Sequence, residues 1–344
     1  LMVRKGMERA CFDNPELAVA RYRSFSDLPG LAQDHGSPLS PVIAAEQSVL
    51  PWSLADNLQK RLSGTVFVGA DHVVSRLRAV KSPWELEKMR TAGKLHTKAT
   101  DELLPRSITP GMTELQVAHI TSDIFYSLGG CGLTRLSGFG EELLLGEVSV
   151  GENGNFPTFY NGPLGCKGAH PAAPFLGCPD SVWRDGKILV LDAGFCFEGY
   201  NSDKTVCYYA GGRNEIPNLI QKAYDVCREI ESEIADRMRP GAIPAELYAL
   251  ALRMAEKSGF SEGFMGLGGN KVPFVGHGIG LCIDEWPVLA SRFDSPLEVG
   301  MTLAVEPKIG LKGVGMVGTE DTWEITDSGA VCLSGGIKHI ICVE

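Results

Sequence analysis

The sequence of 344 residues has no long apolar run, because no stretch approaches the roughly 18 apolar residues that a membrane-spanning helix needs. It has no cluster of lysine and arginine, and its formal net charge is −10, so nucleic acid is not expected as the main partner. None of its ten cysteines forms a Cys-x-x-Cys pair, which argues against a structural zinc site or a disulfide framework. Reduced thiols in a cytoplasmic protein are therefore expected. The chain begins at Leu1 rather than methionine, which leaves open a preceding segment, a signal peptide included.

The composition, with 44% hydrophobic and 22% charged residues, is that of a globular protein long enough for two domains. Residues 1–80 form the first expected domain, with helical spacing over 18–25 and 55–62 and a strand over 65–69. Residues 81–344 form the second, and the motifs that indicate chemistry all lie there.

The second domain carries a helical pattern that occurs twice. Its expected helices cover residues 82–104, 113–128, 217–238 and 244–258. A Pro-Gly pair separates the two helices of each copy, at Pro110-Gly111 and at Pro240-Gly241. These pairs lie 130 residues apart, which indicates an internal duplication.

A second repeat, at an offset of 114 residues, places acids at the ends of predicted strands. Asp192 and Glu306 each follow a glycine and an apolar strand. A returning strand then carries a second acid in each half, Asp203 or Glu320. One such acid would ordinarily lie just past its strand in water, because carboxylates are rarely buried unless they are paired. Two matching pairs favour a shared site instead.

One histidine lies in a glycine-rich loop, Val275-Gly-His277-Gly-Ile-Gly280. Glycine allows close backbone approach, so this loop can hold the imidazole against another group, and a tight turn with an incidental histidine is the alternative.

If the four acids meet, each like-charged pair about 4 Å apart costs about 4 kcal/mol at an effective dielectric constant of 20. The sum rivals the roughly 5–15 kcal/mol stability of a domain. Two divalent cations would relieve this repulsion, and with His277 as a nitrogen ligand the site suits Mn²⁺, Fe²⁺, Co²⁺ or Zn²⁺.

These residues resemble the metal ligands of family M24, which comprises methionine aminopeptidase, aminopeptidase P, prolidase and creatinase. The ligand types appear in the family's order as Asp192, Asp203, His277, Glu306 and Glu320. The resemblance covers residues 81–344, and residues 1–80 look like the latter part of a creatinase-type N-terminal domain. It implies an α/β pita-bread fold with an internally duplicated catalytic domain, two divalent metal ions and usually a homodimer. By analogy, Asp203 and Glu320 would bridge the ions, Asp192 would bind one, and His277 and Glu306 would bind the other.

The substrate side of the site departs from the family. Its peptidases carry a histidine seven residues after the histidine ligand, where this chain has Asp284, and another before the first ligand, where it has Thr158. His170 lies nearer Asp192 and is a candidate catalytic substitute, with an ordinary surface-loop histidine as the alternative. Gly318 replaces an arginine often found two residues before the last ligand. Loss of an oxyanion donor typically lowers a rate by about 10²–10³, and an ionised Asp284 can only accept hydrogen bonds.

Three functions are compatible with these residues. The first is a dinuclear-metal hydrolase resembling Xaa-Pro aminopeptidase and prolidase, which cleaves small peptides or related amides by metal-bound hydroxide. In it Glu306 would shuttle the proton, Asp284 would shape the pocket, and Thr158 would contact the substrate. The second is a metal-dependent lyase of a small, for example sulfonium, substrate with Asp284 as its base. The third is a non-catalytic binding protein of the same fold. The hydrolase is the favoured function. The presence of all five ligand-type residues argues against the binding protein, because nothing structural requires them.

Overall fold

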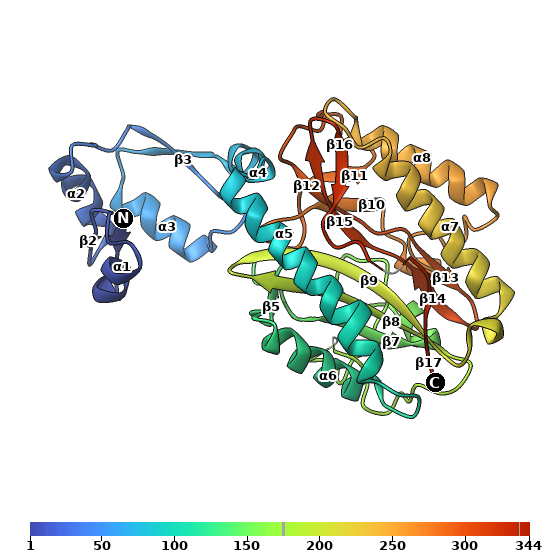
Figure 1. Ribbon diagram of the computed structural model, residues 1–344. Coiled ribbons are helices and arrows are strands. Elements are labelled where there is room, and N and C mark those ends of the chain that lie inside the picture. The colour runs from blue at the N-terminus through green and yellow to red at the C-terminus, as the bar shows by residue number, and fades with distance from the viewer. Residues whose placement is uncertain (174–175, 337) are drawn as a thin grey trace. The chain divides into compact units, whose positions relative to one another are not determined.

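The computed structural model describes residues 1–344 except 174, 175 and 337. The chain divides into a small unit, Leu1–Ser75, and a large unit, Arg76–Glu344, both drawn in Figure 1. The division falls within helix α4 (Asp71–Ala79), a few residues before the domain boundary expected after residue 80. Among the described residues, no helix combines the length and the apolar character that a membrane crossing requires.

The small unit consists of short parallel strand pairs and helices. Its strands are β1 (Met2–Val3), paired with β2 (Ala20–Arg21), and β3 (Val42–Ala45), paired with β4 (Val66–Gly69). Its helices are α1 (Met7–Asp13), α2 (Leu28–Asp34) and α3 (Trp52–Arg61). The predicted helix over 55–62 is confirmed as part of α3, and the predicted strand over 65–69 is confirmed as β4.

The helix predicted over residues 18–25 is wrong. Strand β2 occupies the middle of this segment and pairs with β1. A short 3-10 helix begins only at Phe25, where the Asp27 carboxylate accepts from the N–H of Ser24 and the Ser24 hydroxyl accepts from the N–H of Ser26. The helix was predicted from the local spacing of apolar residues, which carries no information about pairing with a strand elsewhere in the chain. Here the pairing of β2 with β1 makes the backbone extended.

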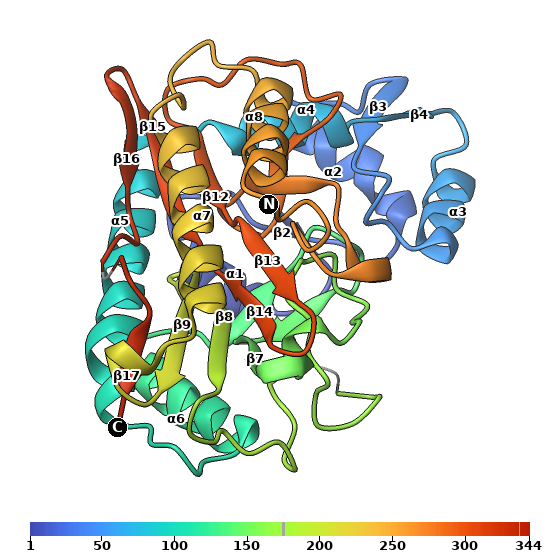
Figure 2. The same ribbon diagram turned by 90° about the vertical axis from the view of Figure 1, so that its right-hand side faces the viewer.

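Long helices flank the sheets of the large unit (Figures 1 and 2). They are α5 (Pro83–Thr97), α6 (Glu114–Ser127), α7 (Asn218–Ala235) and α8 (Pro244–Lys257), which confirms all four predicted positions. Helix α5 begins with a capping box in which Ser82 accepts from the N–H of Glu85, and the Glu85 carboxylate accepts from the N–H of Ser82. It ends at Thr97, and a π-helical turn over Lys98–Leu103 continues it to the predicted end.

Two larger sheets lie between these helices. One has the strand order β17-β9-β8-β7 and the other β11-β10-β12-β15-β16. In chain order these strands are β7 (Gly146–Val150), β8 (Ile188–Phe197), β9 (Tyr200–Ala210), β10 (Phe274–Gly278), β11 (Glu285–Ala290), β12 (Thr302–Val305), β15 (Asp321–Thr326), β16 (Gly329–Cys332) and β17 (Ile341–Val343). Two further hairpins are β5 (Leu133–Arg135) with β6 (Glu142–Leu144) and β13 (Lys308–Leu311) with β14 (Gly315–Gly318).

Each helix pair packs on its own half of the strands. Helices α5 and α6 share a core with β8 and β9, through residues such as Phe125 and Phe195. Helices α7 and α8 share a core with β12 and β14, through residues such as Ile230 and Val317. An isolated bridge between Thr205 and Glu320 connects β9 to the start of β15. The duplicated halves therefore meet where the predicted acids lie.

The two halves differ at one point that shapes the site. Strands β8 and β9 form a continuous antiparallel hairpin. The matching strands of the second half are interrupted at Pro307, which lies between β12 and β13 and has no N–H to donate to a strand ladder. Glu306 and Glu320 flank this interruption, one beside Pro307 and the other beside Thr319, whose N–H donates to the Pro307 carbonyl.

Candidate metal centre

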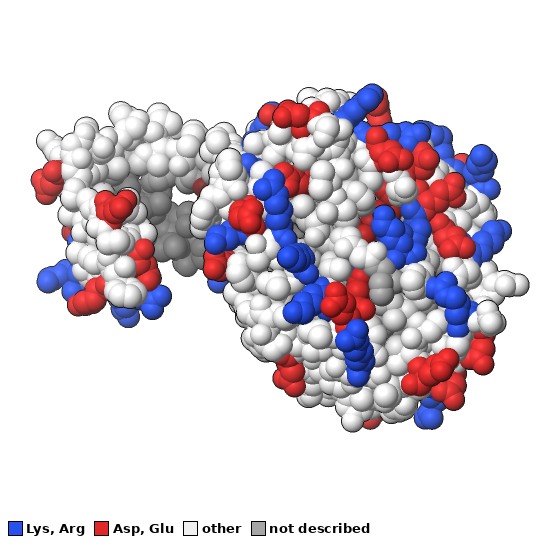
Figure 3. Space-filling model, in the orientation of Figure 1, with Lys and Arg blue, Asp and Glu red and all other residues white. Residues whose placement is uncertain are grey.

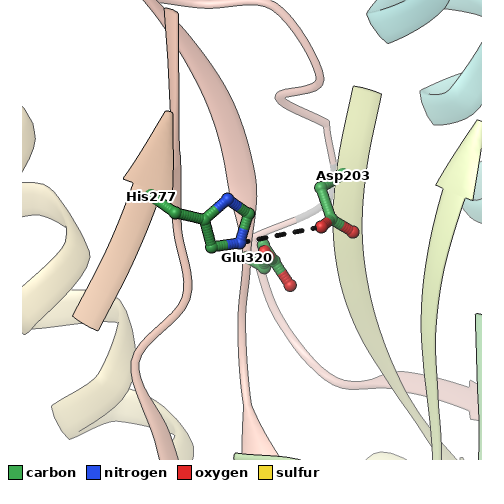
Figure 4. A group of neighbouring side chains, drawn as sticks. All are labelled: Asp203, His277 and Glu320. Carbon is green, nitrogen blue, oxygen red and sulfur yellow. Dashed lines mark ion pairs between the residues drawn. The ribbon is translucent and has the colours of Figure 1, made fainter. Parts of the chain in front are cut away.

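The five predicted ligands come from separate strands and lie together. Asp192 is on β8, Asp203 on β9 and His277 on β10, Glu306 directly follows β12, and Glu320 directly precedes β15. Ligand atoms of Asp203, His277 and Glu320 lie within 4.8 Å of one another, and so do those of Asp192, Glu306 and Glu320. Figure 4 shows the His277 ring reaching from β10 towards Asp203 on β9, with Glu320 between them.

The segment around His277, predicted as a glycine-rich loop, is the buried strand β10. The glycines beside His277 let β10 lie close to its neighbours. A Cβ added to Gly276 would overlap the carbonyl of Ala304 on β12, and one added to Gly278 would overlap the carbonyl of Trp286 on β11. Only glycine avoids both overlaps, so the motif is required by the packing of the sheet. This packing places the His277 side chain in the buried interior of the site.

The His277 ring is oriented for metal binding. Its Nδ1 lies 3.1 Å from the Gly278 carbonyl oxygen, to which an N–H at that atom donates. Its Nε2 lies 3.4 Å from Glu306 Oε1 and 4.0 Å from Asp203 Oδ2. A backbone partner at one ring nitrogen leaves the other free to bind a metal ion.

Burial and neighbouring charges shift the pKa values of four of the predicted ligands in the absence of a metal ion. Burial, reinforced by neighbouring carboxylates, raises the pKa of Asp203 and of Glu320 well above their ordinary values. Burial by itself would also raise the pKa of Glu306. The charges of Lys308 and His277 outweigh it and hold the pKa of that carboxyl below its ordinary value. Burial favours the neutral His277 ring, but Glu306 and Asp203 outweigh it and raise the pKa of His277 to about 9.

The donor set fits a divalent cation. Glu320 is buried, its Oε2 accepts from the Thr205 hydroxyl at 2.8 Å, and its Oε1 has no hydrogen-bond partner among the described residues. A buried carboxylate oxygen without a partner is costly, and a bound cation would satisfy it. Four carboxylates and one imidazole form an oxygen-rich set of the kind that suits Mn²⁺, Fe²⁺, Co²⁺ or Zn²⁺.

Lys308 lies at the centre of this group and was not predicted. Its side chain is fully buried, and its Nζ lies 2.7 Å from Glu306 Oε2, 2.9 Å from Glu320 Oε2 and 3.1 Å from Asp192 Oδ2. A lysine two residues after a predicted ligand, at the start of an apolar strand, is a signal for this position, because residues two apart on a strand share a face.

Glu147 is a second unpredicted acid at the site. It lies on β7 opposite Asp192 on β8, and both line a pocket that His277, Glu306 and Glu320 also line. Burial, reinforced by Asp192, raises the pKa of Glu147 well above its ordinary value, and its Oε1 has no hydrogen-bond partner in the described part of the chain. The repeat that indicates Asp192 does not include Glu147, but an acid next to the apolar residues of β7 is a local signal for this position.

The predicted substrate-side residues have different surroundings. Asp284 lines the pocket, and its carboxylate accepts from the Ser137 N–H at 2.7 Å and from the Ser137 hydroxyl at 3.1 Å. Thr158 accepts from the N–H of Tyr160, and it is Tyr160 that lines the pocket. His170 is on an exposed turn, where its Nδ1 accepts from the N–H of Ala172.

Comparisons with known proteins support the resemblance in sequence. A family model described as metallopeptidase family M24 matches residues 87–327, and one described as the creatinase/prolidase N-terminal domain matches residues 1–80. The Xaa-Pro dipeptidase of Pyrococcus furiosus is 25% identical over 329 residues, which cover 96% of this chain and 82% of the relative. A probable dipeptidase, PepE, of Mycobacterium tuberculosis is 28% identical over 314 residues, which cover 90% and 71%.

Solved structures of similar fold include two named for proline-directed peptidases. The Xaa-Pro dipeptidase from Bacillus anthracis matches with a TM-score of 0.79 at 22% identity, covering 98% of this chain and 84% of that one. The prolidase from Pyrococcus furiosus matches with a TM-score of 0.76 at 22% identity, covering 98% and 87%. The expected pita-bread α/β fold with an N-terminal domain is therefore confirmed.

The duplicated strands and the converging acids thus have their counterpart in a known family. Its model spans well over half of the chain and includes all five of Asp192, Asp203, His277, Glu306 and Glu320. This chain belongs to metallopeptidase family M24 and is a hydrolase of that family.

Proposed function

We propose that this protein is a metal-dependent peptidase that hydrolyses Xaa-Pro dipeptides or short peptides at a bond next to proline. The observation that carries the proposal is the convergence of Asp203, His277, Glu306 and Glu320 on a pocket open to a small substrate. The names of its relatives, Xaa-Pro dipeptidase and dipeptidase, support the same substrate class.

Divalent ions of Mn, Fe, Co or Zn are the proposed cofactors. When bound, such an ion supplies Lewis acidity and lowers the pKa of water towards neutrality. His277 and the carboxylates would hold it. Glu306 is the proposed proton acceptor, because its carboxyl is kept ionised by Lys308 and His277 and its Oε1 faces the His277 side of the site.

Other residues of the pocket would handle the substrate. We assign the shape of the pocket to Asp284, whose carboxylate is already hydrogen-bonded to Ser137. A contact of Thr158 with the substrate and a catalytic part for His170 remain proposals that activity assays of Thr158→Ala and His170→Ala would test. Little loss of rate in both variants would remove them from the mechanism.

A cytoplasmic homodimer is the proposed state of the protein. The ten cysteines are all free thiols, and several of them are buried in the large unit, which favours a reducing compartment. The family resemblance supports the dimer. Light scattering coupled to size-exclusion chromatography would measure the mass in solution, and the mass of one chain would contradict the dimer.

A substrate screen tests the function. Purified protein is incubated with Xaa-Pro dipeptides, Xaa-Pro tripeptides and matched peptides with alanine in place of proline, each with Mn²⁺, Co²⁺, Fe²⁺ or Zn²⁺ present. We expect turnover of a proline peptide with at least one ion, and its loss in Asp203→Asn. Absence of turnover with every ion would overturn the proposal.

The lyase and the binding-protein hypotheses gain no support from the relatives, whose names are peptidase names.

A further inference from the structure

Lys308 adds a fixed positive charge to the candidate metal centre. Its Nζ is within hydrogen-bond distance of one oxygen each of Asp192, Glu306 and Glu320, and its side chain has no exposed surface. An ammonium group has three N–H donors and no acceptor. The Nζ donates hydrogen bonds to Glu306 and Glu320 and forms an ion pair with Asp192, so that three carboxylates surround the buried charge.

The position of this ammonium coincides with one of the two ligand clusters. Asp192, Glu306 and Glu320, which have ligand atoms close enough for one ion, are the three residues that Lys308 contacts. An ion in this cluster must take these oxygens from the ammonium and then lie beside its positive charge. Both steps oppose binding.

The other cluster keeps free ligand atoms. His277 Nε2 faces Glu306 Oε1 and Asp203 Oδ2, whereas the Lys308 ammonium contacts the other oxygen of Glu306, Oε2. Glu320 Oε1 has no hydrogen-bond partner among the described residues. An ion bound by these atoms leaves the contacts of Lys308 intact.

Gly318 makes room for the lysine. The two residues are paired across the β13–β14 hairpin, and a Cβ added to Gly318 would lie 2.6 Å from Lys308 Cγ and 2.7 Å from the Pro307 carbonyl oxygen. A larger side chain at 318 would collide with the stem of Lys308. The buried position of Lys308 therefore depends on a glycine at position 318.

We propose that the Lys308 ammonium takes the place of the second cation, so that the chain binds one divalent ion firmly, through Asp203, His277, Glu306 and Glu320, and a second ion only weakly. This inference rests on the proposed metal-dependent function, but it concerns the number and affinity of the ions rather than the substrate.

Metal counting on the whole protein tests the inference. Wild type, Lys308→Met and Lys308→Gln are loaded with Mn²⁺, freed of unbound ion by gel filtration and analysed for metal per chain. We expect one Mn²⁺ in wild type and two in both variants, with binding of the second ion tightened by roughly 100-fold once the like charge is removed. Electron paramagnetic resonance gives a second readout, an isolated Mn²⁺ signal in wild type and a spin-coupled pair in the variants.

Lys81→Met is the matched control, because Lys81 is also buried but lies 3.5 Å from Glu285, outside the metal ligands. It should retain one ion, as wild type does. Two tightly held ions in wild type, or one in the folded Lys308 variants, would overturn the inference without touching the proposed function. Retention of one ion without any peptide turnover would overturn the function alone, and retention of none would overturn both. If the variants fail to fold, the wild-type count still decides.

Discussion

Gly318 and Lys308 show how two single residues fix each other at the centre of the large unit. Substituting Gly318 with alanine forces its Cβ against the Lys308 stem and the Pro307 carbonyl. We expect Gly318→Ala to lower the free energy of unfolding by about 1–3 kcal/mol, the usual cost of overpacking. Urea unfolding measures this change. Gly269→Ala, at a position with open space around it, is the control and should change the stability little; an equal loss in both variants would contradict the explanation.

His96 is a fully buried residue whose protonation opposes folding. Its Nδ1 lies 3.3 Å from the Ser202 hydroxyl, its ring packs against Phe125 and Phe195, and its Nε2 has no hydrogen-bond partner in the described residues. Burial, with a smaller contribution from Lys204, lowers the pKa of His96 to about 3. The folded state therefore keeps this ring neutral under conditions in which the unfolded chain protonates it.

The sign of the pH effect follows from that difference. Above the ordinary histidine pKa near 6.5 both states are neutral and stability is unaffected. As the pH falls from about 6.5 towards 3, the unfolded state takes up the proton and the protein loses stability, in total on the order of 4 kcal/mol. Urea unfolding at pH 7 and pH 4 should show a smaller decline for His96→Met than for wild type. Equal declines would show that His96 is not responsible.

At the level of elements, Asp284 links the start of β11 to the loop between β5 and β6. Both of its carboxylate oxygens accept hydrogen bonds from Ser137 in that loop, which borders the pocket. Asp284→Asn keeps an oxygen that can accept from the Ser137 N–H. We therefore expect peptide turnover by this variant to stay within about threefold of wild type, whereas Asp284→Ala should raise KM more strongly. Loss of activity in Asp284→Asn with unchanged metal content would instead support a chemical role for the carboxylate.

The sequence predicts elements and ligands where the signal is local. The capped helix α5, the helices on either side of each Pro-Gly pair, and Glu306 at the end of β12 are visible in residue spacing, and the structure places them as expected. Asp192 differs, because β8 continues beyond it to Phe197, so that this acid lies within the strand rather than at its end. The pairing of β2 with β1 was missed, because it depends on a partner distant along the chain. Lys308 was missed for the same reason: its burial depends on three carboxylates from β8, the end of β12 and the start of β15.

At the scale of the whole molecule, the candidate metal centre lies where the two duplicated halves of the large unit meet. Its ligands run from Asp192 to Glu320 and come from both duplicated halves, so that an ion bound there connects two sheets and their helices. None of the five predicted ligands lies in the small unit, Leu1–Ser75. Ion binding should therefore stabilise one unit of the chain and leave the other unchanged.

Amide hydrogen exchange with and without Mn²⁺ measures this difference segment by segment. At an ion concentration about 100 times the dissociation constant, binding to the folded state adds about 2.7 kcal/mol to its stability. We expect exchange to slow by up to about 100-fold in 188–210 and 302–326, where opening requires release of the ion, and to stay unchanged in residues 1–75. Asp203→Asn is the control and should show no effect of Mn²⁺. Equal slowing in both units of wild type would mean that the ion stabilises the chain through contacts outside the five ligands.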